Sequence, residues 1–75
     1  MSVQNTISPA QCRAGRALIE MTQGALAEAA SVSKSVIVDF EKGHRVPNRN
    51  NLTAIQRALE EAGVEFVDRG ARLAG

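Results

Sequence analysis

The segments from Thr22 to Ala30 and from Ser33 to Gly43 constrain the fold more than any other part of the chain. Thr22 and Ser33 each stand directly before a run of helix-forming residues. Such hydroxyl side chains cap helix N-termini by accepting a hydrogen bond from a free backbone N–H. Gly43 can adopt the left-handed conformation that ends a helix. The sequence therefore predicts two short helices separated by a turn of only a few residues.

Apolar residues in both segments have helical spacing. The first helix is expected to bury Leu26, Ala27 and Ala30. In the second segment, Val36, Ile37 and Val38 favour a strand locally. We nevertheless predict a helix that runs to about Lys42, because Ile37 and Phe40 share a helix face and both ends carry helix signals.

One further helix is predicted before this pair. Ser8 can cap it, and Pro9 stands at its first position, where the missing N–H has no cost. We expect this helix to run to about Glu20, with an apolar face formed by Cys12, Ala14, Ala17, Leu18 and Ile19.

Another helix is predicted after the pair. Leu52, Ile55 and Leu59 recur at helical spacing, with Asn50 or Asn51 as the cap and Gly63 as the end. The polar, Pro-containing residues 44–50 before it are expected to form an ordered surface loop.

The chain divides into three parts by these signals. Residues 1–7 are expected to be a flexible N-terminus, and residues 8–63 form the domain with the paired helices. In residues 64–75, Val64 and Phe66 alternate with Glu65, and residues 68–70 can turn the chain back. The predicted fold is an all-α bundle of four main helices with a short C-terminal strand or hairpin. Because an isolated hairpin is marginally stable, it must pack on the helices or on a second subunit.

Composition favours a binding protein over an enzyme. A chain of 75 residues holds one small domain, in which the aliphatic side chains are needed for the core. Nine Lys and Arg against eight Asp and Glu give a net charge of +1, but residues 34–49 carry four basic and two acidic side chains. This local excess of two positive charges suggests an anionic contact.

The remaining chemistry is sparse. Cys12 is the one cysteine, so neither an intramolecular disulfide nor a cysteine zinc cluster can form, and one histidine, His44, does not make a metal site. We expect no catalytic residues and no cofactor, because no acid–base or nucleophilic constellation is present. The absence of a long apolar run or a signal sequence predicts a cytoplasmic protein with no membrane contact.

The paired helices have the spacing of a helix-turn-helix, in which the N-terminal part of the second helix enters the major groove of DNA. The residues TQGALAEAASVSKSVIVDFEKG and the Leu, Ile, Leu helix after them resemble the phage-repressor and Cro-like family, the XRE-type helix-turn-helix. The resemblance covers about Pro9 to Val64, and the tail RALEEAGVEF is similar to that of small stand-alone bacterial regulators. It implies a lambda-repressor-like bundle that binds double-stranded DNA.

The resemblance also implies roles for individual residues. Gln23 matches a phosphate contact that braces the recognition helix, and Arg16 with Glu41 matches a pair linking the first and third helices. Base or adjoining backbone contacts are implied for Ser33, Lys34, Ser35 and Asp39. Sugar-phosphate contacts are implied for Lys42, His44, Arg45 and Arg49. Of Val36 and Val38, one is expected to meet a thymine methyl group and the other a partner.

Two positions depart from the family pattern. Asp39 stands where a hydrogen-bond donor is common, and its carboxylate can accept from cytosine N4 but is repelled by phosphate. Ser31 stands where glycine is common in the turn, so a non-glycine residue is expected in a left-handed conformation.

We therefore expect a nucleoid-associated transcriptional regulator that acts as a homodimer on an inverted repeat, because one recognition helix reads only a few base pairs. The fourth helix and the tail from Val64 to Leu73 are the expected dimer interface. The alternative is an antitoxin or anti-activator that uses the same scaffold to bind another protein. The modest net charge and Asp39 support this alternative.

Overall fold

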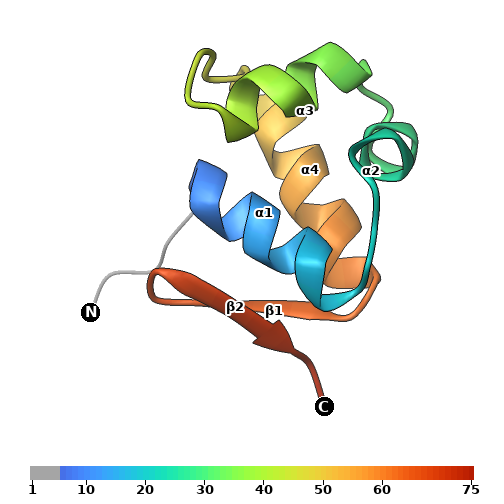
Figure 1. The fold of residues 1–75 in the computed structure, drawn as a ribbon, viewed down its shortest axis with the longest axis vertical. Helices are drawn as coiled ribbons and strands as arrows, with labels where there is room; N and C mark the ends of the chain where they lie inside the picture. The colour runs from blue at the N-terminus through green and yellow to red at the C-terminus, as the bar shows by residue number, and fades with distance from the viewer. Residues whose placement is uncertain (1–5) are drawn as a thin grey trace.

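The computed structural model describes residues 6–75, which form four helices followed by a two-stranded antiparallel hairpin (Figure 1). The elements in chain order are α1 (Pro9–Leu18), α2 (Gln23–Ala30), α3 (Lys34–Glu41), α4 (Arg49–Glu61), β1 (Val64–Val67) and β2 (Gly70–Leu73). The predicted helical bundle with a C-terminal hairpin is confirmed. None of the helices within residues 6–75 has the length and apolar character needed to cross a membrane.

The predicted helix caps explain where the first three helices begin. The side chains of Ser8, Thr22 and Ser33 accept hydrogen bonds from the backbone N–H groups of Gln11, Ala25 and Val36, respectively. Gly43, with φ of +78°, follows the end of α3, as expected for a residue that closes a helix. These local signals position α2 and α3 within about one residue of the sequence prediction.

The predicted start of the fourth helix is wrong by two or three residues. Asn48, not Asn50 or Asn51, is the N-cap, and its side chain accepts from the N–H of Asn51 at 2.8 Å. The first turn of α4 is polar and largely exposed, so it carries no apolar periodicity that could reveal it. Arg49 is therefore the first helical residue of α4 rather than part of the loop.

The core lies between the helices and the inner face of the hairpin. Its buried apolar side chains are Ile7, Cys12, Leu26, Ala27, Ala30, Ile37, Phe40, Leu52, Ile55, Ala58, Leu59 and Val64. The predicted buried edge of α2 is confirmed. Residues 1–5 of the expected flexible terminus lie outside the described residues, whereas Ile7 is 3% exposed, so the packed chain begins before Ser8.

The predicted apolar face of α1 needs correction. Cys12 is fully buried and Ile19 packs on the core, but Ala17 and Leu18 are exposed. Gly15 lies against the hairpin instead, where an added Cβ would come within 3.4 Å of the Phe66 ring. The close approach of α1 to the hairpin is the physical reason, because it turns the Gly15 side of the helix inward.

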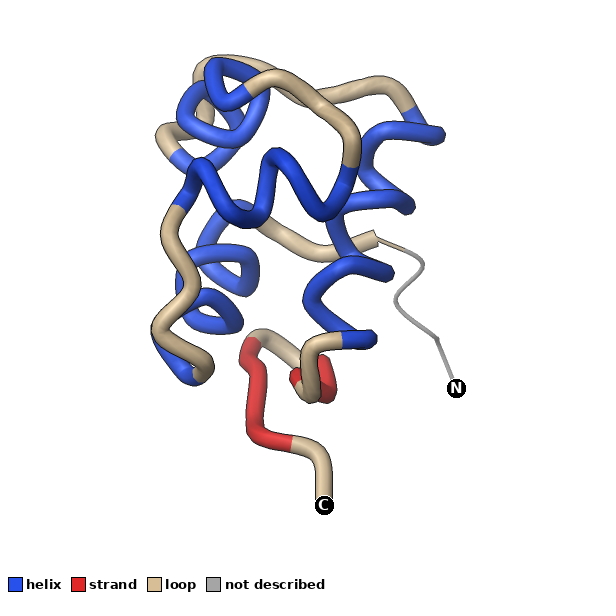
Figure 2. Tube along the Cα trace, turned by 90° about the vertical axis from the view of Figure 1, so that its right-hand side faces the viewer, coloured by secondary structure: helices blue, strands red, loops and turns tan. Residues whose placement is uncertain are grey.

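The hairpin packs beneath α1, on the opposite side of the molecule from α3 (Figures 1 and 2). Val64 pairs with Leu73 and Phe66 with Ala71, and Asp68 and Arg69 form the turn. Val64 and Phe66 pack on the core, whereas Leu73 is 57% exposed. The hairpin therefore leans on the helices, as its small size requires.

The side chain of Gln11 connects the hairpin to the start of α1 by hydrogen bonds. Its side-chain oxygen accepts from the N–H of Ser8 at 2.9 Å, completing a capping box. Its amide nitrogen donates to the carbonyl oxygens of Val67 and Gly70 at 2.8 and 3.1 Å. One buried side chain thus connects a helix cap with both strands beside the hairpin turn.

Replacing Gln11 tests this connection. We expect Gln11→Ala to lower the free energy of unfolding by about 2 kcal/mol, because buried groups lose their partners in two elements. Ser8→Ala is the matched control and removes only the cap, at a cost of about 1 kcal/mol. Urea unfolding measures both values. Equal losses in the two variants would contradict the role of Gln11 in holding the hairpin.

Candidate nucleic-acid interface

Helices α2 and α3 are joined by a tight turn formed by residues 31–33. Ser31 has φ of 57° and ψ of 42°, so the predicted left-handed residue is confirmed. The N–H of Val32 closes the turn by donating to the carbonyl oxygen of Ala27 at 3.0 Å. This is the geometry of a helix-turn-helix, with α3 as the second helix.

The first turn of α3 faces solvent while the rest of the helix is anchored in the core. Lys34 and Ser35 are exposed beside the exposed cap Ser33. Ile37 and Phe40 are 0% and 3% exposed and fix the helix on the bundle. The helix therefore presents its N-terminal end, which is the part that enters a major groove in this motif.

Val36 and Val38 are both half-buried. Val36 packs against the core cluster. Val36 therefore has a structural role, so it is the least accessible of the residues that we matched to base contacts in the first turn of α3.

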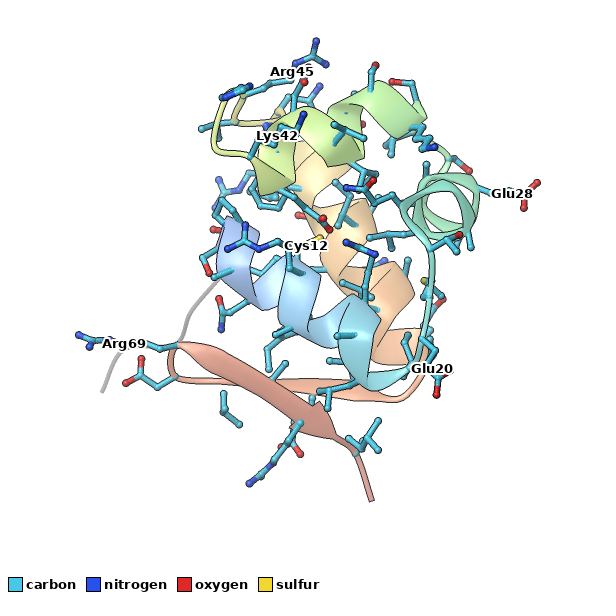
Figure 3. The ribbon with its side chains drawn as sticks, viewed as in Figure 1. Cys12, Glu20, Glu28, Lys42, Arg45 and Arg69 are labelled. Carbon is cyan, nitrogen blue, oxygen red and sulfur yellow. The ribbon has the colours of Figure 1, made fainter. Side chains whose placement is uncertain are left out.

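Four basic or potentially basic side chains surround the C-terminal end of α3 and the loop after it. These are Lys42, His44, Arg45 and Arg49, all exposed. Lys42 and Arg45 lie at the α3 end of the molecule, far from Arg69 at the hairpin turn (Figure 3). We call these four residues the basic loop cluster. Together with the exposed residues of the first turn of α3, they make up the candidate surface for DNA.

Asp39 introduces a negative charge into this surface. Its carboxylate Oδ2 lies 3.7 Å from Nη2 of Arg45, and its backbone carbonyl accepts from the N–H of His44 at 2.8 Å. The Asp39 and Arg45 side chains are 37% and 49% exposed, so their attraction adds little to stability. The contact keeps the carboxylate near a compensating cation.

Glu41, at the C-terminal end of α3, is a buried carboxylate that is only 4% exposed. Arg16 binds it with both ends of the guanidinium group, from Nη2 to Oε1 and from Nε to Oε2, each at 2.7 Å. Gln23 donates to Oε1 at 3.1 Å, and the Cys12 thiol donates to Oε2 at 3.1 Å. We call these residues, Cys12, Arg16, Gln23 and Glu41, the Glu41 network. It joins α1 and α2 to the end of α3.

Opposing effects act on the pKa of Glu41. Burial alone raises it, but hydrogen bonds from Arg16, Cys12 and Gln23, together with the charge of Arg16, leave the pKa below its ordinary value. The hydrogen bond to Glu41 raises the pKa of Arg16 and outweighs the opposite effect of burial. The network therefore holds a charged carboxylate and a charged guanidinium in place.

The resemblance implied a pair of Arg16 with Glu41, and this contact is present. Gln23 contacts Glu41 of α3, whereas its implied phosphate contact stays a prediction. Two neighbours on α1 were not predicted. Cys12 was assigned only a packing role, and Arg13, which donates from Nη1 to the backbone carbonyl of Glu41, was given no role. Arg13 stands three residues before Arg16 on the same helix. This spacing was the sequence feature that could have indicated that Arg13 also contacts the end of α3.

Comparisons with known proteins agree with this geometry. Residues 13–66 match the family described as helix-turn-helix. The DNA-binding domain of the P22 C2 repressor, residues 1–76, is 29% identical in sequence with a TM-score of 0.67. The similarity covers 77% of this chain and 76% of that domain. The search of curated proteins gave no match.

These findings first define a helix-turn-helix domain. More narrowly, the chain belongs to the XRE-type helix-turn-helix family of DNA-binding transcription regulators.

The Glu41 network makes stability depend on pH. Because the folded pKa of Glu41 lies below its ordinary value of 4.5, its contribution is complete above that value and is lost as the pH falls through the folded pKa. We expect Glu41→Gln to lower the free energy of unfolding by about 3 kcal/mol near neutral pH. Between about pH 6 and about pH 3, the variant is expected to lose less stability than the wild type.

Urea unfolding across this pH range measures the effect. Glu65→Gln is the control, because Glu65 makes its ion pair with Arg72 on the exposed surface of the hairpin. If the free energy of unfolding of Glu41→Gln fell with pH as steeply as that of the wild type, Glu41 would not be the group that makes stability depend on pH.

Proposed function

We propose that this protein is a sequence-specific regulator that binds double-stranded DNA as a homodimer on an inverted-repeat operator. The observation that carries the proposal is the exposed first turn of α3 together with the basic loop cluster at the other end of the helix, with α3 bound to α1 and α2 by the Glu41 network. Such a surface combines base readout with phosphate contacts, which are the two parts of specific DNA recognition.

In the proposed complex, the N-terminal end of α3 lies in the major groove. Lys34 and Ser35 donate to base edges, and Ser33 contacts bases or the adjoining backbone. Gln23, the first residue of α2, contacts phosphate together with the free N–H groups of that helix end. The basic loop cluster binds the sugar-phosphate chain and displaces counterions.

In the proposed complex, Asp39 favours particular bases and does not increase the affinity for DNA in general. Its carboxylate accepts a hydrogen bond from cytosine N4, while Arg45 offsets its repulsion of phosphate. Val36, packed on the core on one side, offers an apolar contact for a thymine methyl group.

A homodimer supplies the second recognition helix. One helix reads only a few base pairs, and two copies related by a twofold axis read half-sites about 10 base pairs apart. We propose α4 and residues 64–73 as the interface. The exposed apolar side chains of Val67 and Leu73 support this surface.

Lys34 tests base readout. We expect Lys34→Ala to weaken binding to the preferred operator by about 1 to 3 kcal/mol and to leave binding to random DNA much less affected, because a bidentate contact to guanine is lost. Titration of labelled duplexes measures both affinities. Lys42→Ala is the matched control and is expected to weaken both duplexes alike. An equal loss on both duplexes for Lys34→Ala would reduce Lys34 to a phosphate contact.

Arg45 tests the phosphate contacts. We expect Arg45→Ala to weaken binding to all sequences and to lower the slope of log affinity against log salt by about one, because one fewer counterion is displaced. Arg69→Ala, at the distant hairpin turn, is the control and should leave the slope unchanged. An Arg45→Ala slope equal to that of the wild type would count against the basic loop cluster as the phosphate-binding surface.

A further inference from the structure

Cys12 makes a polar contact that its place in the core does not require. Its side chain has no exposed surface, and its neighbours in the core cluster are apolar. Its sulfur nevertheless lies 3.1 Å from Oε2 of Glu41, in hydrogen-bonding geometry. A residue that served only to fill space would not need to direct a donor at the carboxylate.

The thiol completes the set of donors around Glu41. Each carboxylate oxygen accepts one bond from Arg16. Gln23 provides the second bond to Oε1, and Cys12 provides the second bond to Oε2. Because Cys12 is fully buried, solvent does not substitute for its S–H on that side, and without the thiol Oε2 would keep only its bond from Arg16.

The protonation state of Cys12 suits this role. Burial raises the pKa of the thiol most strongly, and the hydrogen bond and negative charge of Glu41 raise it further, against smaller opposite effects of Arg16 and Arg13. Cys12 therefore remains a thiol, which donates to the carboxylate. A thiolate at this position would repel it.

We propose that Cys12 is a positioning residue for DNA binding, whose S–H fixes the Glu41 carboxylate from the core side and thereby orients Gln23 and α3. The proposal rests on the proposed function, because Gln23 and α3 matter only if they contact DNA. It assigns Cys12 an effect on binding although the residue itself cannot reach the nucleic acid.

The groups that act on Glu41 are few. From α1, Cys12, Arg13 and Arg16 contact it through side chain or backbone, and from α2 the uncharged amide of Gln23 does so. Among the described residues, therefore, burial raises the pKa of Glu41, and the bonds from Arg16, Cys12 and Gln23 lower it below its ordinary value.

Raman spectroscopy of the intact protein tests the bond directly. Cys12 is the one cysteine of the chain, so a single S–H stretching band arises from it. We expect this band at a lower frequency than that of a free thiol, and a shift to higher frequency in Glu41→Gln. Asp39→Asn, a carboxylate change on the same helix, is the control and should leave the band in place. A wild-type band at the free-thiol frequency, or one unmoved in Glu41→Gln, would overturn the proposal.

Cys12→Ala and Cys12→Ser test the effect on binding. The two side chains have similar size, but only serine donates a hydrogen bond. We expect Cys12→Ala to bind the operator about 2- to 10-fold more weakly than the wild type and Cys12→Ser to recover part of the loss. We also expect the acid unfolding midpoint of Cys12→Ala to rise by about 0.5 to 1 pH unit, and that of Cys12→Ser to rise less.

Binding is compared at a temperature where circular dichroism shows each variant fully folded. The proposal would be overturned if Cys12→Ala had the operator affinity and the acid unfolding midpoint of the wild type. It would also be overturned if Cys12→Ser bound the operator no more tightly than Cys12→Ala. If Cys12→Ala does not fold, the Raman comparison decides. If the wild type binds no duplex DNA, the proposed function itself fails, and a shifted S–H band would then show a purely structural bond.

Discussion

A carboxylate that is 4% exposed must receive hydrogen bonds from its neighbours, and Glu41 receives them from α1 and α2 while it stands at the end of α3. An ion pair as buried as Arg16 and Glu41 adds little net stability relative to apolar packing, but removing one partner is costly. Its main consequence is geometric. The network and the packing of Ile37 and Phe40 together connect α3 to the rest of the bundle.

Helix α1 links the two ends of the molecule. Gln11 binds the hairpin, and the next residue, Cys12, binds the end of α3. The candidate DNA surface and the hairpin therefore lie on opposite sides of one short helix (Figure 1). This separation leaves the exposed residues of the hairpin available for contacts that do not compete with DNA.

Local signals made most of the fold predictable. Ser8, Thr22, Ser33 and Gly43 marked helix ends, whereas the left-handed Ser31 followed from the resemblance to a family in which glycine is common at this position. The start of α4 was misplaced because its exposed first turn has no apolar pattern. The bonds of Gln11 and Cys12 were missed because their partners lie 56 and 29 residues away, and such polar contacts leave no trace in spacing. The DNA contacts of individual residues stay predictions.

Selection of binders from a random pool of duplex DNA, at near-physiological salt, tests whether the protein binds a specific operator as a dimer. We predict enrichment of an inverted repeat whose half-sites are centred about 10 base pairs apart. Weak, salt-sensitive retention of all sequences without enrichment would contradict it, and would favour the alternative in which this scaffold binds another protein.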